Sequence, residues 1–203
     1  MKFLEHLRIK LRIISGKYKS RIINAPKGLD VRPTTDRVRE AMFSSLISIY
    51  GNLDNACVLD AFAGSGALGF ESISRGAQKL FSFENNKKTY ENLLNNFKSL
   101  NENDAKVKII YGDVTKYKFD FLCNGVKFDI LFFDPPYENS PLVVLEILKE
   151  LKSSNLNKNA VVVYEHSATN NFEKFKKNFE SENFVLKNAK IYGEIAVEFL
   201  IFK

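Results

Sequence analysis

The chain has 203 residues, of which 45% are hydrophobic and 27% are charged, so a disordered, low-complexity or collagen-like protein is excluded. No apolar run approaches the ~20 residues of a membrane helix, and the first residues carry no pattern of a secretory signal. Two cysteines and two histidines at scattered positions predict neither a disulfide framework nor a metal site. We therefore expect a cytoplasmic protein with one main domain, no bound metal and no membrane contact.

Positive charge is concentrated near the start of the chain. Residues 1–40 hold 11 Lys and Arg against four Asp and Glu, whereas the whole chain has a net charge of +6. A basic segment beside a neutral body favours contact with a polyanion, most often nucleic acid. The alternative is a solvated surface in a Lys-rich chain.

The N-terminal region predicts a small appendage followed by a helix. Two short strands, 11–15 and 20–24, flank the Gly-containing turn 16–19, which is typical of a β-hairpin. A helix is expected over 36–50, because apolar residues recur every four positions along it. We accordingly divide the chain into a basic hairpin and loop, 1–35, and a main domain, 36–203.

From residue 57 onward, strand-like and helix-like patterns alternate and end in a hairpin. This order predicts an α/β fold with a mostly parallel seven-stranded sheet, helices on both faces and an antiparallel C-terminal pair. Such sheets bind ligands at the carboxyl ends of their strands. The expected strands cover 57–62, 79–84, 107–111, 128–133, 160–164, 185–192 and 195–202, and the expected helices cover 66–75, 87–100, 141–151 and 172–179.

The first motif is a glycine-rich turn between a strand and a helix. Gly64, Gly66 and Gly69 match the G-x-G-x-x-G pattern, which lets backbone approach a ligand at a helix N-terminus. Asp60 precedes the turn, where a carboxylate is poorly placed for a pyrophosphate but well placed for a cationic amino group. S-adenosylmethionine carries such a group and has no phosphate, so the motif favours that cofactor.

Two further acidic residues follow the next strands. Glu84 comes 24 residues after Asp60, at the distance typical of a carboxylate that binds a ribose diol. Asp113 follows the third strand, where it can accept a hydrogen bond from an adenine amino group, or where it is an ordinary turn residue.

The most specific motif is Asp134-Pro135-Pro136-Tyr137, directly after an apolar strand. Two prolines make a rigid turn with exposed carbonyls. Asp134 and the carbonyl of Pro135 can therefore accept both protons of an exocyclic amine, while Tyr137 can stack on a flipped-out base. Accepting these hydrogen bonds aims the nitrogen lone pair at a methyl donor.

The glycine turn and this tetrapeptide together resemble class I S-adenosylmethionine-dependent amino-methyltransferases. Further stretches narrow the resemblance to the bacterial 16S rRNA guanine-N2 methyltransferases of the RsmD family, over residues 11–203. These stretches are Leu11–Gly16, Arg32–Phe43, Phe62–Gly69 and Ser74–Ala77, with Glu165-His166 and Tyr192-Gly193 as further matches.

The resemblance implies a substrate, a cofactor and site residues. The substrate would be a guanine N2 amine of 16S rRNA, free or in an assembling small subunit, with no obligate protein partner. Asp134 to Tyr137 would hold the target amine. The cofactor would be held by Asp60, Ala63, Gly64, Ser65, Gly66, Glu84, Asp113 and Thr34, and the basic residues for RNA contact would be Arg12, Lys17, Lys19, Arg21, Arg32 and Arg37.

Three alternatives remain open from the residues. An adenine-N6 methyltransferase acting on RNA or DNA would use the same tetrapeptide, although the chain length leaves little room for a DNA-recognition region. A nicotinamide oxidoreductase would use the glycine pattern, but Asp60 argues against it. A non-catalytic RNA-binding module would use the basic hairpin, but the intact Asp60 and Asp134 argue against that function.

Overall fold

A computed structural model describes residues 10–26, 35–103, 105–119, 125–136, 139–152 and 154–203. Three of the expected site residues, Arg32, Thr34 and Tyr137, lie outside the described residues. Within the described part of the chain, no helix is long and apolar enough to cross a membrane.

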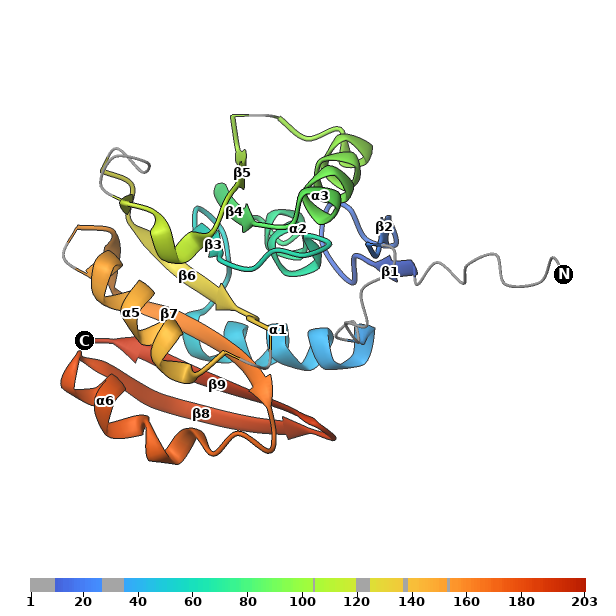
Figure 1. Ribbon diagram of the computed structural model, residues 1–203. Coiled ribbons are helices and arrows are strands. Elements are labelled where there is room, and N and C mark those ends of the chain that lie inside the picture. Colours follow the sequence, from blue (N-terminus) through green and yellow to red (C-terminus); the bar gives the residue numbers. More distant parts are fainter. Residues whose placement is uncertain (1–9, 27–34, 104, 120–124, 137–138, 153) are drawn as a thin grey trace, which may run out of the picture.

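One seven-stranded sheet forms the centre of the molecule (Figure 1), as the sequence predicted. Its first five strands are parallel, whereas the last pairings, β7 with β9 and β9 with β8, are antiparallel. In spatial order the strands are β5 (Val107–Tyr111), β4 (Lys79–Glu84), β3 (Cys57–Asp60), β6 (Phe128–Phe133), β7 (Leu156–Ser167), β9 (Ile195–Phe202) and β8 (Phe184–Tyr192).

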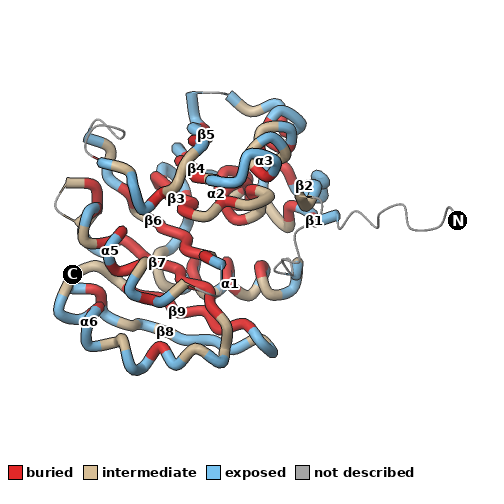
Figure 2. Tube along the Cα trace, in the orientation of Figure 1, coloured by how far each residue is buried: buried red, intermediate tan, exposed pale blue. Residues whose placement is uncertain are grey.

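Helices cover both faces of this sheet. One face packs on α1 (Asp36–Tyr50), α2 (Ala67–Ser74) and α3 (Lys87–Leu100). The other face packs on α5 (Pro141–Lys152), α6 (Lys176–Ser181), and the short helices η1 (Val114–Lys116) and η2 (Phe172–Lys174). The central strands are therefore buried on both faces (Figure 2), which explains their continuous apolar sequences.

The N-terminal hairpin is shorter than the sequence predicted. Its strands are β1 (Lys10–Arg12) and β2 (Ile22–Asn24), joined by a nine-residue connection over 13–21. The expected strands 11–15 and 20–24 are too long. Ile13 still exchanges backbone hydrogen bonds with Ser20 and Arg21, but backbone groups between these residues bond to α2 instead of continuing the ladder. Lys17 N–H donates to the carbonyl of Ser74 at 2.7 Å, and Tyr18 N–H donates to the Ser74 hydroxyl at 2.9 Å.

The connection is also part of the hydrophobic core. The side chains of Ile13 and Tyr18 are 1% and 5% exposed and join the cluster beneath α2 and α3. Figure 1 shows the hairpin lying against these two helices. Residues 10–26 thus form a hairpin packed on helices of the main sheet, and the division of the chain at residue 35 stays a prediction.

Two other elements differ from the sequence predictions by more than two residues or in kind. Strand β7 runs from Leu156 to Ser167 instead of 160–164, because its first residue pairs with Phe128 of β6 and its C-terminal half pairs with β9 up to Ser167. The helix expected over 172–179 is divided into η2 and α6, which meet at Phe175.

Candidate active site

The strand order places three acidic residues at one edge of the sheet. The chain leaves β3 toward β4 and β5 on one side, and toward β6 and β7 on the other, so the topological switch point lies between β3 and β6. Asp60 ends β3, Glu84 ends β4 and Asp134 directly follows β6. The structure therefore brings these carboxylates to the place where doubly wound sheets bind ligands.

Asp60 holds the start of α2. Its side chain is 2% exposed, and its Oδ2 accepts a hydrogen bond from Gly69 N–H at 3.0 Å. A carboxylate at the first turn of a helix also interacts favourably with the helix dipole. These contacts fix the Asp60 carboxyl group beside the glycine turn.

Glu84 bridges the glycine turn and the next helix. Its Oε2 accepts from Gly64 N–H at 3.1 Å, and its Oε1 accepts from Asn86 N–H at 2.7 Å. Asn86 in turn caps α3. Burial raises the pKa of Glu84, although the N–H groups of Asn86 and Gly64 act to lower it. Each oxygen keeps a second lone pair, so a ribose hydroxyl can still donate to this carboxylate.

The glycine turn needs glycine for two separate reasons. Gly64 and Gly66 have φ of +54° and +86°, which L side chains rarely adopt. A Cβ at Gly66 would also stand 2.3 Å from Phe70 Cε2 and 2.5 Å from Leu93 Cδ1. No described atom lies within 4 Å of the corresponding position at Gly64, so the backbone there is open to a ligand.

Backbone hydrogen bonds complete the turn. Ala63 N–H donates to the carbonyl of Phe83 at 2.9 Å, and Gly66 N–H donates to the carbonyl of Ala63 at 2.7 Å. The expected cofactor residues Asp60, Ala63, Gly64, Ser65, Gly66 and Glu84 thus lie together. Their assignment to a cofactor stays a prediction.

Burial raises the pKa of both Asp60 and Asp134 to about 7. For Asp60, burial is the main cause of this value; the hydrogen bond from Gly69 acts to lower the pKa, and the nearby charges of Asp134 and Glu84 act to raise it. Two carboxyl groups that repel each other in a poorly hydrated site are the arrangement expected where a cation or a proton is bound.

The turn after Asp134 is rigid in its described part. Pro135 is buried and Pro136 is exposed, and the carbonyl of Pro136 accepts from Asn139 N–H at 2.9 Å. Phe133 directly before it pairs with Tyr164 of β7, which anchors the strand end. The main chain therefore leaves β6 next to the end of β3, and this places Asp134 at the switch point beside Asp60.

Asp113 has a local structural role. Its Oδ1 accepts from the backbone N–H and the hydroxyl of Thr115, at 3.1 and 2.7 Å, and its Oδ2 lies 3.4 Å from Lys116 Nζ. Burial raises its pKa, but these hydrogen bonds outweigh burial and hold the pKa below its usual value. Asp113 therefore caps η1, and its contact with adenine stays a prediction.

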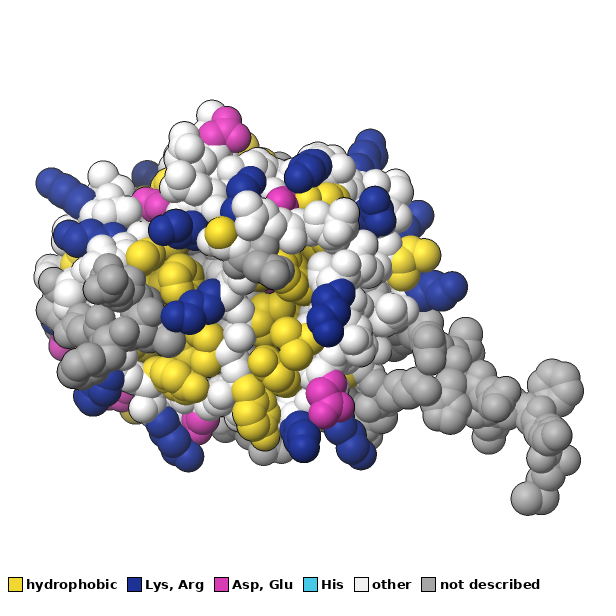
Figure 3. Space-filling model, turned by 90° about the horizontal axis from the view of Figure 1, so that it is seen from above, with side chains coloured by type: hydrophobic (Ala, Val, Ile, Leu, Met, Phe, Trp, Pro, Cys, Tyr) yellow, Lys and Arg dark blue, Asp and Glu magenta, His cyan; other side chains and the backbone are white. Residues whose placement is uncertain are grey.

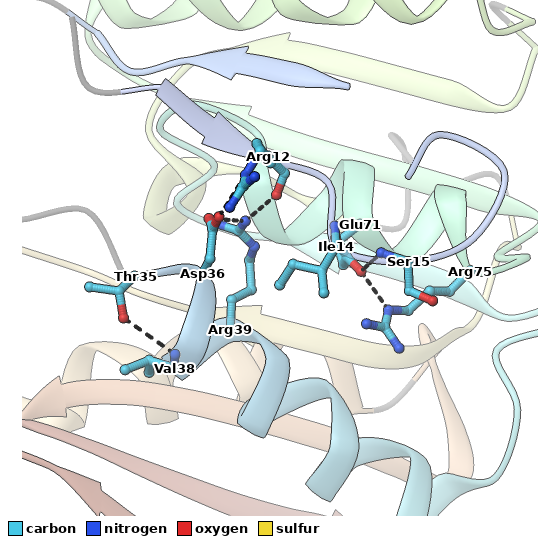
Figure 4. Close-up of polar contacts among 9 residues, drawn as sticks. All are labelled: Arg12, Ile14, Ser15, Thr35, Asp36, Val38, Arg39, Glu71 and Arg75. Atoms are coloured by element: carbon cyan, nitrogen blue, oxygen red, sulfur yellow. Dashed lines mark hydrogen bonds and ion pairs between the residues drawn. The ribbon is translucent and has the colours of Figure 1, made fainter. Parts of the chain in front are cut away.

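The basic residues proposed for RNA contact differ in whether their side chains already bond to other groups of the protein. Lys19 and Arg37 are exposed, whereas Arg12 pairs with Asp36 at 3.3 Å, as Figure 4 shows. Lys17 Nζ lies 3.3 Å from Glu102, and Arg21 Nη1 donates to the carbonyl of Ser99 at 3.4 Å. Glu102 partly neutralises Lys17, so Lys19 and Arg21 are the stronger candidates on the hairpin.

Several buried polar residues that hold the hairpin were not predicted from the sequence. Glu71 is 0% exposed and accepts from Ile14 N–H, Ser15 N–H and Arg75 Nε at 2.7, 3.1 and 2.6 Å (Figure 4). Arg39 is 1% exposed and donates to Asp36 and to the carbonyl of Arg12. Both residues are charged and lie among apolar residues of one helix face, and this pattern in the sequence could have indicated a buried, hydrogen-bonded charge.

The fold and the switch-point turn define a class I methyltransferase: a seven-stranded α/β sheet whose last strands are antiparallel. The family model described as "Conserved hypothetical protein 95" matches residues 11–201. The chain therefore belongs to this family, which is the RsmD family of methyltransferases.

Individual relatives agree with this assignment. The chain is 31% identical to "Ribosomal RNA small subunit methyltransferase D" of Haemophilus influenzae, over 92% of this chain and 91% of the relative. It is 32% identical to an uncharacterized methylase of Rickettsia prowazekii, over 91% and 94%. A solved Escherichia coli structure, the candidate methyltransferase yhhF, superposes with a TM-score of 0.76 at 29% identity and covers 96% of this chain and 99% of that one.

Proposed function

We propose that this protein methylates the exocyclic N2 amine of a guanine in small-subunit rRNA, with S-adenosylmethionine as methyl donor. The observation that carries the proposal is the placement of Asp60 and Asp134 on either side of the switch point, next to the open glycine turn. The rRNA substrate is supported by the relatives named ribosomal RNA small subunit methyltransferase D. The N2 position rests on the resemblance of the sequence motifs.

The acceptor groups of the site suit S-adenosylmethionine. Asp60 is buried and acidic, so its ionised form would bind the cofactor's ammonium, and Glu84 would bind the ribose hydroxyls. The open backbone at Gly64 leaves space for the methionine part. When bound, S-adenosylmethionine supplies a methyl group on a sulfonium sulfur.

The chain's own residues orient the amine and remove its proton. Asp134 would accept a hydrogen bond from the guanine N2 amine and aim the nitrogen lone pair at the methyl carbon. The amine nitrogen so held by Asp134 would take the methyl group, and the electron pair of the carbon–sulfur bond would stay with the sulfur. The nitrogen then releases one proton, for which Asp134 is a suitable acceptor because burial raises its pKa to about 7.

The test separates cofactor binding from turnover. Asp134→Ala should keep S-adenosylmethionine binding and lower methyl transfer by ~10²–10³-fold, since it removes one oriented electrostatic contact. Asp60→Ala should abolish detectable binding because it removes a charge-assisted hydrogen bond. Tyr137→Ala should weaken capture of the base, whereas Tyr137→Phe should have a mild effect.

Calorimetry with S-adenosylmethionine and transfer of labelled methyl to 16S rRNA, followed by nucleoside digestion, measure both quantities. N2-methylguanosine is the expected product. Label on adenine N6 would instead favour the adenine methyltransferase, and near-normal turnover by Asp134→Ala would contradict the assigned mechanism.

A further inference from the structure

Asn96 is a buried amide that connects the hairpin to the glycine turn. It lies on α3 among the buried residues Leu93, Phe97 and Leu100, and it is only 2% exposed. Its Nδ2 donates to the carbonyl of Ser65 at 2.9 Å and to the carbonyl of Asn24 at 2.9 Å. Its Oδ1 accepts from Asn24 N–H at 3.0 Å. All of these partners are backbone groups.

The partners fix the orientation of the amide. Asn24 N–H can only donate, so the atom that faces it must be the oxygen, and the NH₂ group must face the two carbonyls. A buried side chain that bonds to three backbone groups is costly to replace, because Asn24 N–H and the Ser65 carbonyl would lose the bond that Asn96 makes to them.

The position of Ser65 makes this contact relevant to the site. Ser65 stands between Gly64 and Gly66, both at positive φ, and glycines restrict the backbone less than other residues. The hydrogen bond from Asn96 to the Ser65 carbonyl therefore restrains the turn between two glycines, where the backbone could otherwise adopt several conformations. The same amide pairs with the end of β2, so the turn and the hairpin are held by one side chain.

We propose that Asn96 is a positioning residue for the cofactor turn: it holds the Ser65 carbonyl and so keeps the turn in its binding conformation. The inference rests on the proposed use of S-adenosylmethionine. Asn96 acts through the turn and does not touch the reacting atoms. Its loss should weaken cofactor binding while leaving the methyl-transfer chemistry at Asp134 intact.

Asn92 provides a matched control. It lies one helical turn before Asn96 and its Nδ2 donates to the same Asn24 carbonyl at 2.8 Å. Both substitutions to Ala therefore loosen the hairpin, but Asn96→Ala also removes the bond to the Ser65 carbonyl, which Asn92→Ala leaves in place. A merely structural role at the hairpin would give the two variants similar cofactor affinities.

The experiment measures the Kd for S-adenosylmethionine by calorimetry on the full chain, at a temperature where circular dichroism shows each variant folded. Asn96→Ala should raise Kd by about 5- to 10-fold, and Asn92→Ala by less than about 2-fold. At saturating cofactor, kcat for methyl transfer by Asn96→Ala should stay within about 2-fold of the unaltered protein.

Asn96→Asp is a second variant of nearly the same shape. It keeps the acceptor for Asn24 N–H but places an oxygen against two carbonyls, and it can donate to one of them only when protonated. The ratio of its Kd to that of the unaltered protein should therefore fall as the pH is lowered from 8 to 6.

The outcomes distinguish this inference from the proposed function. If the unaltered protein binds no S-adenosylmethionine, the proposed function fails and this inference fails with it. If the unaltered protein binds the cofactor but Asn96→Ala and Asn92→Ala have equal Kd values, or the Asn96→Asp ratio is independent of pH, only the role of Asn96 is overturned.

Discussion

At the scale of single residues, the two aspartates at the switch point give the site a dependence on pH. Burial raises the pKa of Asp60 and of Asp134 to about 7, so the folded protein binds protons more tightly than the unfolded chain does between about pH 4 and pH 7. Their contribution to stability is therefore present at low pH and is lost as the pH rises through 7. Cofactor binding should show the opposite dependence, because an ammonium group requires the ionised Asp60.

We expect the affinity for S-adenosylmethionine to rise by about tenfold between pH 6 and pH 8, since a group with a pKa near 7 is mostly neutral at the lower value. Asp60→Asn should bind weakly at both pH values and lose most of this dependence. Calorimetry at several pH values, corrected for buffer ionisation, measures how the affinity for S-adenosylmethionine depends on pH. An affinity that falls with rising pH in the unaltered protein would contradict the assignment of Asp60 to the ammonium group.

Single residues also show what the sequence could and could not reveal. Asp60 and Asp134 were predictable because each lies at the C-terminal end of an apolar strand, which is a fixed place in a parallel sheet. Asn96 was less visible because its partners, Asn24 and Ser65, lie 72 and 31 residues away and are backbone groups. Backbone partners of this kind leave no pattern of side-chain types in the sequence.

At the scale of elements, the glycine turn is fixed by packing as well as by backbone conformation. Gly66→Ala should destabilise the protein by roughly 2–4 kcal/mol, because the added Cβ meets Phe70 and Leu93 and the backbone has positive φ. Gly193→Ala is the matched control: Gly193 has φ +64° but no described atom within 4 Å of its Cβ position, so about 1–2 kcal/mol is expected.

Urea unfolding of the two variants gives both free energies. Gly66→Ala should also lose cofactor binding, whereas Gly193→Ala should bind normally. Equal destabilisation by the two substitutions would mean that the contact with Phe70 and Leu93 relaxes at no cost.

The elements themselves were predicted unequally. Helices and central strands follow from their apolar periodicity, and most of their bounds agree with the structure within a residue or two. The strand bounds predicted for the hairpin did not agree with the structure. Glu71 and Ser74 of α2 bond to backbone groups of 14–18 that a longer hairpin ladder would use. The length of β7 depends on its antiparallel partner β9, which is a tertiary pairing that the local sequence does not determine.

At the scale of the whole molecule, the basic charge is asymmetric in sequence but more widely spread in space. Residues 1–40 hold 11 of the 30 Lys and Arg. Figure 3 nevertheless shows Lys and Arg side chains around much of one face, with hydrophobic side chains gathered in its centre. Charge alone therefore does not single out one RNA-binding surface, and a comparison of two distinct basic surfaces is required.

The N-terminal hairpin and the edge strand β8 provide these two basic surfaces. Lys19 and Arg21 are exposed beside β2, whereas Lys187 and Lys190 are exposed on β8, the edge strand on the other side of the sheet from β5. Lys17 is left unchanged because Glu102 pairs with it. Both double substitutions to Ala remove two positive charges, so any difference between them reflects location and not net charge.

If the hairpin contacts the RNA backbone, Lys19→Ala with Arg21→Ala should weaken binding to a 16S rRNA fragment. It should also flatten the salt dependence by ~0.7 log units per lost contact, because fewer counterions are released. The β8 double variant should bind with nearly the original affinity and slope, and S-adenosylmethionine affinity should be unchanged in both. Fluorescence anisotropy over a salt series measures these quantities. Equal loss by both variants would show that only overall charge matters, and an unchanged slope in the hairpin variant would show that Lys19 and Arg21 form a solvated surface.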